Sequence, residues 1–431
     1  MTKKRVNVIT MGCSKNLVDS EVLLKQLELG NFEVRHDSSE SNFDAVFINT
    51  CGFILDAKQE SIDMILNYVE AKKRGDIEKL YVMGCLSERY RKDLKKEIPE
   101  VDRYFGKFEL KAMVDELKVT YQPEYIYERK ITTPSHFAYL KISEGCNRSC
   151  SFCAIPMMTG RYKSRTIEDL VREAHYLAKK GVKEILLIAQ DLSYYGIDIY
   201  GEIRLAELVG KISEIESIEW IRLHYLYPAK FPFEILTLMR ENLKVCRYID
   251  IPLQHIANPV LKNMLRHVSR KETESLIKKI KKEVPEVIIR TTMIVGFPGE
   301  TEQDFEEMKQ FIRETKFERL GVFQYSHEEG TYASEKFDDN LSDEIKQARA
   351  NEIMELQRQI SAELNQQKIG QVFKVIVDRK EGDFFIGRTE YDSPEVDGEV
   401  IISSTNELKI GEFVNVKITG AEDYDLFGQV E

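Results

Sequence analysis

The sequence predicts an α/β protein with three folded regions. Strand-like and helical runs alternate through most of the chain, which is typical of parallel α/β architecture. From Gly370 onward they give way to short β-rich runs, which indicate a small antiparallel barrel. The length of 431 residues agrees with about three domains at roughly 150 residues each. We expect an open parallel sheet over residues 1–121, a partial (βα)6 barrel over 132–340, a linker helix over 341–367 and a small β-barrel over 368–431.

The composition excludes the membrane, secreted and disordered classes of protein. Hydrophobic residues make up 42% of the chain and charged residues 31%, which is ordinary for a globular protein. The longest apolar runs are far shorter than the ~18 residues of a membrane helix. Met1–Thr10 lacks the apolar stretch of an export signal, so we expect a cytoplasmic protein without a membrane partner. The net charge of −11 excludes a general attraction for nucleic acid, although not a local basic groove.

The N-terminal region alternates between strands and helices. Strands are predicted over Arg5–Thr10, Asp44–Asn49 and Leu80–Met83, and helices over Asp19–Leu29 and Ala57–Val69. A cysteine follows each strand almost at once, and ligands of parallel sheets gather beyond the carboxyl ends of the strands. We therefore expect three thiols that are far apart in sequence to converge on one point: Cys13, Cys51 and Cys85.

The central region contains too few strands for a complete eight-stranded barrel. A charged segment with prolines, Gln122–Pro134, is the predicted linker that precedes it. A partial, open barrel should have its functional face at the carboxyl ends of its strands. The six predicted strands are Phe137–Ile142, Glu184–Ala189, Trp220–Tyr225, Tyr248–Leu253, Ile288–Val295 and Arg319–Tyr325.

The C-terminal region holds most of the net negative charge. A long amphipathic helix is predicted over Leu341–Leu364, ahead of the small barrel. From Lys368 to the end the chain has 7 basic and 14 acidic residues. The barrel strands, of the oligonucleotide-binding kind, are predicted over Val372–Val377, Phe384–Gly387, Val400–Ser403 and Phe413–Ile418.

The seven cysteines point to metal binding. An odd number in a chain without an export signal argues against a disulfide framework. Cys146, Cys150 and Cys153 form a Cys-x3-Cys-x2-Cys group, and thiolates are ligands for zinc or for iron–sulfur clusters. A structural zinc site is closed by four ligands, whereas three thiolates leave one metal position open for chemistry. The alternative is a zinc knuckle that borrows a distant fourth ligand.

This cysteine group, in the loop after the first barrel strand and with Phe152 before its last cysteine, resembles the radical S-adenosylmethionine superfamily. The resemblance implies that Cys146, Cys150 and Cys153 hold a [4Fe–4S] cluster whose open iron binds S-adenosylmethionine. It also implies that an electron donor triggers cleavage of the sulfonium, which gives a 5′-deoxyadenosyl radical that abstracts hydrogen from an unactivated carbon.

Further loops resemble the same superfamily. The segment Thr292–Glu300 is similar to its adenine-contact segment, with Thr292 in place of the usual glycine. Gln190 and Gln254 end the second and fourth strands, where the resemblance implies contact with the methionine or ribose moiety or with the substrate. The alternative for each is a turn or a helix cap. The implied cofactor-binding residues are Gln190, Gln254, Gly296, Gly299 and Glu300.

The order of the regions resembles the methylthiotransferases within this superfamily. There Cys13, Cys51 and Cys85 would bind a second [4Fe–4S] cluster, whose open iron carries the sulfur, and the last region would be a substrate-recognising TRAM-type barrel. The alternative is that these are buried core thiols. Cys246 lies outside both groups, and we expect it to be a core thiol.

Two branches of the methylthiotransferases compete. One modifies an adenosine of transfer RNA, and the other modifies the β-carbon of an aspartate in the small-subunit ribosomal protein S twelve. An acidic C-terminal barrel would repel phosphate and suit a basic protein, although such acidity can also serve solubility alone. Local strings resemble the ribosomal-protein branch: Met11–Glu21, Asn49–Ile54, Ile251–His255 and Asp392–Gly398.

We therefore expect an oxygen-sensitive ribosomal-protein methylthiotransferase, with transfer RNA as an unlikely substrate. A departure from the family lies at Met158–Gly160, where an arginine usually precedes the glycine, and Arg161 and Arg165 are candidates to compensate. A different class, a non-catalytic iron–sulfur binding module, would need neither an open iron nor the Gly296–Gly299 loop.

Overall fold

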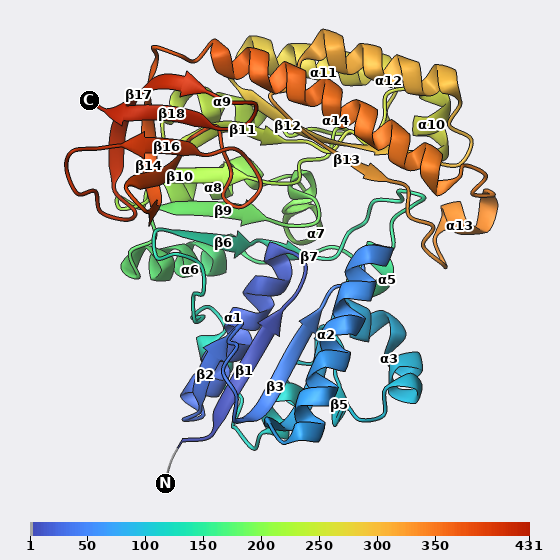
Figure 1. Cartoon of the computed structure of the whole chain (residues 1–431), viewed down its shortest axis with the longest axis vertical. Coiled ribbons are helices and arrows are strands. Elements are labelled where there is room, and N and C mark those ends of the chain that lie inside the picture. The colour runs from blue at the N-terminus through green and yellow to red at the C-terminus, as the bar shows by residue number, and fades with distance from the viewer. Residues whose placement is uncertain (1–2) are drawn as a thin grey trace.

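The structure, a computed structural model, describes residues 3–431, so the first two residues of the segment examined for an export signal lie outside it. It confirms the predicted fold class, with an N-terminal parallel sheet, a partial barrel and a small closed barrel (Figure 1). No helix among these described residues is long and apolar enough to cross a membrane.

The N-terminal sheet has five parallel strands in the order β2-β1-β3-β4-β5. Two separate apolar cores cover its faces, one packed with α2 and α3 and the other with α1 and α4. The elements are β1 (Arg5–Thr10), α1 (Ser14–Leu29), β2 (Glu33–His36), β3 (Phe43–Thr50), α2 (Leu55–Arg74), β4 (Ile77–Gly84), α3 (Cys85–Glu97), β5 (Arg103–Tyr104) and α4 (Leu110–Glu116).

Helix α1 begins at Ser14, five residues before the predicted start at Asp19. The backbone carbonyl of Cys13 accepts hydrogen bonds from Asn16 and Leu17, so the helix starts directly after this cysteine. The prediction was wrong here because the first turn buries polar side chains, which break the apolar periodicity.

The central sheet has six parallel strands in the order β13-β12-β11-β10-β9-β6 and leaves β6 and β13 as free edges. All six predicted strands are present within a few residues of the expected bounds, with helices covering the outer face. The strands are β6 (Phe137–Lys141), β9 (Glu184–Ile188), β10 (Trp220–Leu223), β11 (Val245–Asp250), β12 (Ile288–Val295) and β13 (Arg319–Gln324). The larger helices are α6 (Ile167–Lys179), α8 (Leu205–Ser213), α9 (Glu234–Glu241), α11 (Arg270–Glu283) and α12 (Glu302–Thr315).

Short elements shape the loops of the partial barrel. They are the η1 turn (Pro123–Tyr125), β7 (Ser143–Glu144), α5 (Ile155–Thr159), β8 (Lys163–Ser164), the η2 turn (Leu192–Tyr194), α7 (Ile197–Tyr200), α10 (Asn258–Asn263) and α13 (Tyr332–Lys336).

The predicted linker is held by contacts at several points along its length, and Arg129 is its buried residue. Arg129 is 2% exposed and forms ion pairs with Glu21 of α1 and Glu173 of α6, and it also donates to the carbonyl of Tyr139. Because a buried guanidinium needs charged partners, these contacts fix α1 against the partial barrel.

The last region is a closed five-stranded barrel that follows the long helix α14 (Asp343–Gln366). Its strand β18 was not predicted, because a glycine in its middle interrupts its short apolar run. The expectation of an antiparallel barrel needs one correction, since β16 pairs with β18 in parallel. The strands are β14 (Val372–Glu381), β15 (Phe384–Thr389), β16 (Val400–Ser403), β17 (Phe413–Ala421) and β18 (Leu426–Val430).

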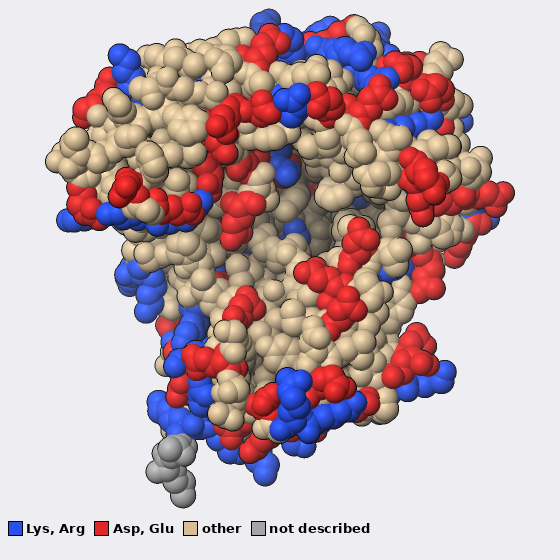
Figure 2. Space-filling model, viewed as in Figure 1, with Lys and Arg blue, Asp and Glu red and all other residues tan. Residues whose placement is uncertain are grey.

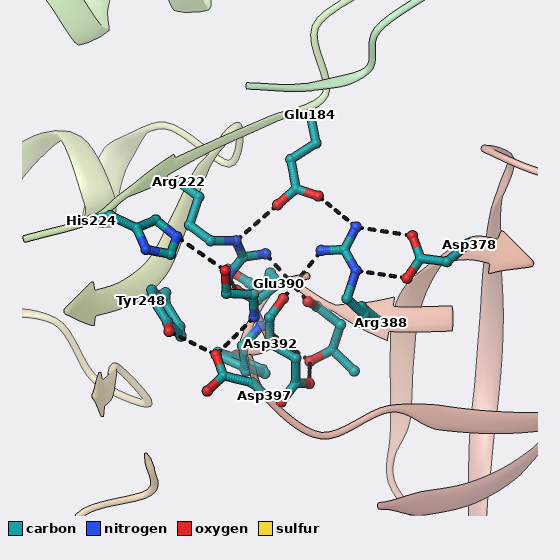
Figure 3. Close-up of polar contacts among 12 residues, drawn as sticks. Glu184, Arg222, His224, Tyr248, Asp378, Arg388, Glu390, Asp392 and Asp397 are labelled. Atoms are coloured by element: carbon teal, nitrogen blue, oxygen red, sulfur yellow. Dashed lines mark hydrogen bonds and ion pairs between the residues drawn. The ribbon is translucent and has the colours of Figure 1, made fainter. Parts of the chain in front are cut away.

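The loop between β15 and β16 projects into the partial barrel, where buried ion pairs hold it (Figure 3). Glu184 at the start of β9 accepts from Arg222 at 2.8 Å and pairs with Arg388 of β15 at 2.8 Å. Tyr248 of β11 donates to Asp397 at 2.7 Å. The small barrel is therefore anchored to the inner face of the strands of the partial barrel.

Candidate active site

The carboxyl ends of the strands of both sheets face a common hollow. In Figure 1, β1 and β3 point toward the partial barrel, and α1 starts at the junction. Val18 of α1 packs with Phe137 and Tyr139 of β6, so α1 lies against one free edge of the barrel. The space-filling view in Figure 2 shows the hollow, with basic side chains visible inside it and acidic ones at its rim.

Cys146, Cys150 and Cys153 lie together in the loop between β7 and α5, and all three are partly exposed. The amide of Cys153 donates to the carbonyl of Cys150 at 3.1 Å, and the amide of Cys146 donates to the carbonyl of Gly160 at 3.2 Å. Gly145 has φ +78°, and a Cβ there would lie 2.1 Å from the carbonyl oxygen of Arg161. Only glycine therefore permits this tight loop.

Two arginines lie beside these thiols. Arg266 donates to the Cys150 sulfur at 3.3 Å and stacks on the Tyr227 ring at 4.3 Å. Arg148 also stacks on Tyr227, at 4.0 Å, and donates to Asp191 at 2.6 Å. Neither arginine could be predicted from the sequence, because an isolated arginine carries no distinguishing pattern.

Burial makes this group of thiols suited to metal rather than to free thiolate chemistry. Desolvation raises the pKa of Cys146 to about 11, and it raises the pKa of Cys153 as well. A metal centre displaces such protons when it binds, and it supplies the positive charge that the buried thiolates require. The donor set therefore fits a thiolate-bound centre.

Cys13 and Cys51 lie in loops after β1 and β3, and Cys85 is the first residue of α3 after β4. Gly12 has φ +88°, and a Cβ there would lie 3.0 Å from the Cys51 sulfur, so the first two loops touch. Burial is the main cause that raises the pKa of Cys85 to about 12; Lys107 opposes the rise, and the neighbouring Cys13 and Cys51 thiols contribute to it. The backbone thus brings these three cysteines near one another, as expected.

The spacing of the thiols bears on the zinc alternative. Over residues 3–431, no three His, Cys, Asp or Glu side chains are close enough to hold a single metal ion together. A single zinc ion needs that close spacing, whereas the thiolates of a cubane cluster bind different iron atoms and stand further apart. The zinc knuckle and the iron–sulfur cluster both stay predictions.

Cys246 lies apart from both groups, as expected. It is 1% exposed on β11 and packs with Trp220 and Tyr248. Burial raises its pKa to about 12, so it remains a neutral core thiol.

The turn from Gly296 to Glu300 is braced from behind. The Glu300 carboxylate accepts from the Gly296 amide at 3.0 Å and from Arg349 of α14 at 2.6 Å, and it lies 3.4 Å from His255. The Glu300 side chain has no exposed surface, so it holds the turn in place instead of facing the hollow. Gly299 is exposed.

The two glutamines expected at strand ends are half-buried. Gln254 has φ +77°, and its backbone bonds to Thr292 and Ile294 extend the sheet beyond β11. Gln190 lies two residues after the end of β9. Of the two arginines considered as compensating, Arg165 is engaged with Glu173 at 2.6 Å, whereas Arg161 is exposed.

Comparisons with known proteins cover the whole chain. The Radical SAM superfamily profile matches residues 140–312, the TRAM domain profile matches 369–430, and the uncharacterised protein family UPF0004 matches 5–106. A protein of Bacteroides thetaiotaomicron named ribosomal protein uS12 methylthiotransferase RimO is 54% identical over 431 residues, covering 100% of this chain and 99% of that protein. Proteins of the same name from Christiangramia forsetii and Flavobacterium johnsoniae are each 55% identical, covering 100% of this chain and 95% and 98% of theirs.

Solved structures share the fold at low identity. The radical S-adenosylmethionine methyltransferase TsrM from Kitasatospora setae, with cobalamin and a [4Fe–4S] cluster bound, has a TM-score of 0.55 and 15% identity, covering 75% of this chain and 72% of its own. OxsB, with aqua-cobalamin and S-adenosylmethionine bound, has a TM-score of 0.52 and 13% identity, covering 83% and 56%.

Proposed function

Since the chain belongs to the family of ribosomal protein uS12 methylthiotransferases, we propose that it adds a methylthio group to the β-carbon of an aspartate in that protein. It is a radical S-adenosylmethionine methylthiotransferase, because full-length relatives named uS12 methylthiotransferases are 54% identical to it and its residues 140–312 match the radical SAM superfamily. Cytoplasmic action and a separate electron donor are part of the same proposal.

The observation that supports the chemistry is the placement of two thiol groups around one hollow. Cys146, Cys150 and Cys153 would hold the [4Fe–4S] cluster that binds S-adenosylmethionine. The second group, Cys13, Cys51 and Cys85, would hold a second [4Fe–4S] cluster. When bound, these groups supply the radical that removes a hydrogen atom, the sulfur that takes its place and, from another S-adenosylmethionine, the methyl group.

The chain's own residues would position these groups and keep water away. Glu300 and Arg349 hold the Gly296 turn at the end of β12, where we propose contact with the adenine. Gln190 and Gln254 lie at two other strand ends, available to S-adenosylmethionine or to the substrate. Arg266 supports Cys150 through its hydrogen bond to the sulfur.

The charge of the C-terminal barrel gives less support to a basic partner than its composition suggests. Asp378 pairs with Arg388 at 2.6 Å, Asp392 pairs with Arg319, and Asp397 pairs with Arg290 at 3.4 Å. These carboxylates neutralise buried arginines instead of facing solvent. The preference for the ribosomal protein over transfer RNA therefore rests mainly on the relatives.

A paired assay tests the proposed substrate. Anaerobically reconstituted enzyme with S-adenosylmethionine, sulfide and a strong reductant is given either a uS12 peptide that contains the target aspartate or transfer RNA that lacks its methylthio group. Mass spectrometry should show one added methylthio group on the peptide alone. Modified transfer RNA would establish the rival substrate, and failure to cleave S-adenosylmethionine would indicate a non-catalytic binding module.

A further inference from the structure

Lys15 reaches from the N-terminal region into the partial barrel. It lies in the first turn of α1, two residues after Cys13, and is 7% exposed. Its ammonium nitrogen is 3.9 Å from the centre of the Tyr225 ring, and Tyr225 follows the carboxyl end of β10. The ammonium group therefore lies between the loop of Cys13 and the face of the barrel where the strands end.

This buried cation forms no direct ion pair with a carboxylate in the structure. Within residues 3–431, no carboxylate oxygen lies within 4.0 Å of the Lys15 nitrogen, and no side chain or carbonyl accepts a hydrogen bond from it. The Tyr225 ring supplies some stabilisation through a cation–π contact. Removing an ammonium from water without a hydrogen-bonded anion is costly, so this position favours the arrival of an anion that can accept its hydrogen bonds.

The neighbouring charges are already matched with one another. Asp19 pairs with Lys107 at 2.8 Å and also with Lys141, and Glu144 pairs with Lys141 at 2.8 Å and Lys107 at 3.9 Å. Three ammonium groups thus share two carboxylates. Lys15 is the one of these three ammonium groups that pairs directly with neither carboxylate.

We propose that the ammonium of Lys15 binds the carboxylate of the substrate aspartate, an inference that rests on the proposed function. In an aspartate the carboxylate is attached directly to the β-carbon, so a contact to the carboxylate fixes the reacting carbon within one bond. Lys15 lies next to Cys13, on the side that would deliver sulfur. Lys15 thus serves as a positioning and specificity residue, and a neutral adenine offers it no such anion.

The test compares the binding of two peptides to the full-length, anaerobically reconstituted enzyme in the presence of S-adenosylmethionine. One is the uS12 peptide with its target aspartate, and the other carries asparagine at that position. Dissociation constants are measured by calorimetry for wild type, Lys15→Met, Lys15→Arg and Lys25→Met. Lys25 is a matched control, because it lies on the same helix, about 15 Å further along, and faces Glu128 at 3.7 Å.

Wild type should bind the aspartate peptide roughly tenfold to a hundredfold more tightly than the asparagine peptide, as a lost charged hydrogen bond implies. Lys15→Met should bind the two peptides equally, Lys15→Arg should keep part of the preference, and Lys25→Met should match wild type. Iron content and peptide-independent cleavage of S-adenosylmethionine should stay at wild-type levels in Lys15→Met. If that variant retains too little iron, Lys15→Gln takes its place under the same criterion.

Two results would overturn different claims. A Lys15→Met enzyme that still prefers the aspartate peptide would contradict the assignment of Lys15. If that variant also shows an altered spectrum of the cluster at Cys13, Lys15 is a counterion of the cluster and not a substrate-binding residue. Wild-type enzyme that neither binds nor modifies the aspartate peptide would overturn the proposed function itself, and the assignment with it.

Discussion

Six cysteine side chains divide the proposed reaction into two separable halves. The group at Cys146 lies in the barrel loop beside Arg266, whereas the group at Cys51 lies at the end of the N-terminal sheet. Since the two groups belong to different sheets, loss of one thiol should leave the other group intact.

The first prediction concerns single thiol variants. Cys146→Ala should abolish cleavage of S-adenosylmethionine, because one of three cluster ligands is lost. Cys51→Ala should still form 5′-deoxyadenosine but add no sulfur to the peptide. Chromatography of the nucleoside and mass spectrometry of the peptide measure both, with Cys246→Ala as the control that keeps both activities. Methylthiolated product from Cys51→Ala would contradict the division.

The cysteine groups could be predicted from the sequence because thiol spacing and placement after strands are local signals, and their role as cluster ligands stays a prediction. Lys15, Arg266 and Lys107 could not be found in this way, since their importance comes from neighbours supplied by distant segments. Glu300 was found by resemblance, but only the structure shows that its carboxylate is fully engaged in bracing the turn.

The loop between β15 and β16 lies against the inner face of the partial barrel, whose strands are far from it in the sequence. Its flanking residue Arg388 pairs with Glu184 at 2.8 Å and with Asp378 at 2.6 Å, and all three side chains are largely buried. The six barrel strands were predictable from their apolar runs, whereas this docking was not, because nothing local to residues 389–398 specifies a partner.

The second prediction is that Arg388→Met destabilises the protein by about 3–5 kcal/mol, because it removes the guanidinium shared by two buried carboxylates and leaves Asp378 with only His136. Thermal unfolding of the apoprotein measures this as a lower Tm. The double variant Arg388→Met with Asp378→Asn should recover part of the loss, since it removes the carboxylate that has lost its guanidinium. A single variant with wild-type Tm would show that the interface contributes little.

The third prediction concerns acid stability. Burial opposes ionisation of Glu184, Asp378 and Asp392, but the adjacent arginines, with His136 at Asp378 and Lys368 at Asp392, hold the pKa of each below its ordinary value of 4.5 or 3.8. A lowered pKa in the folded state contributes stability that is complete above the ordinary value and is lost as the pH falls below it. Urea midpoints should therefore be steady from pH 7 to about 5 and fall steeply below about pH 4.5. In Arg388→Met the fall should be shallower, and an unchanged slope would contradict this origin.

The whole chain combines three regions around one hollow. The order of the regions and the fold class could be predicted from the alternation of strands and helices and from the change to short β-rich runs near Gly370. The parallel pairing of β16 with β18 and the early start of α1 did not follow, because both depend on tertiary contacts. The domain boundaries at residues 121, 132, 340 and 368 stay predictions.

The measurement that bears most directly on this account is the iron and sulfide content of the anaerobically reconstituted protein, with electron paramagnetic resonance after reduction. Two [4Fe–4S] clusters predict about eight iron atoms per chain in wild type. A triple alanine variant of either Cys13, Cys51 and Cys85 or Cys146, Cys150 and Cys153 should retain about four, each with a different spectrum. About four iron atoms in wild type, lost entirely when one group is removed and unaffected when the other is, would contradict the two-cluster site.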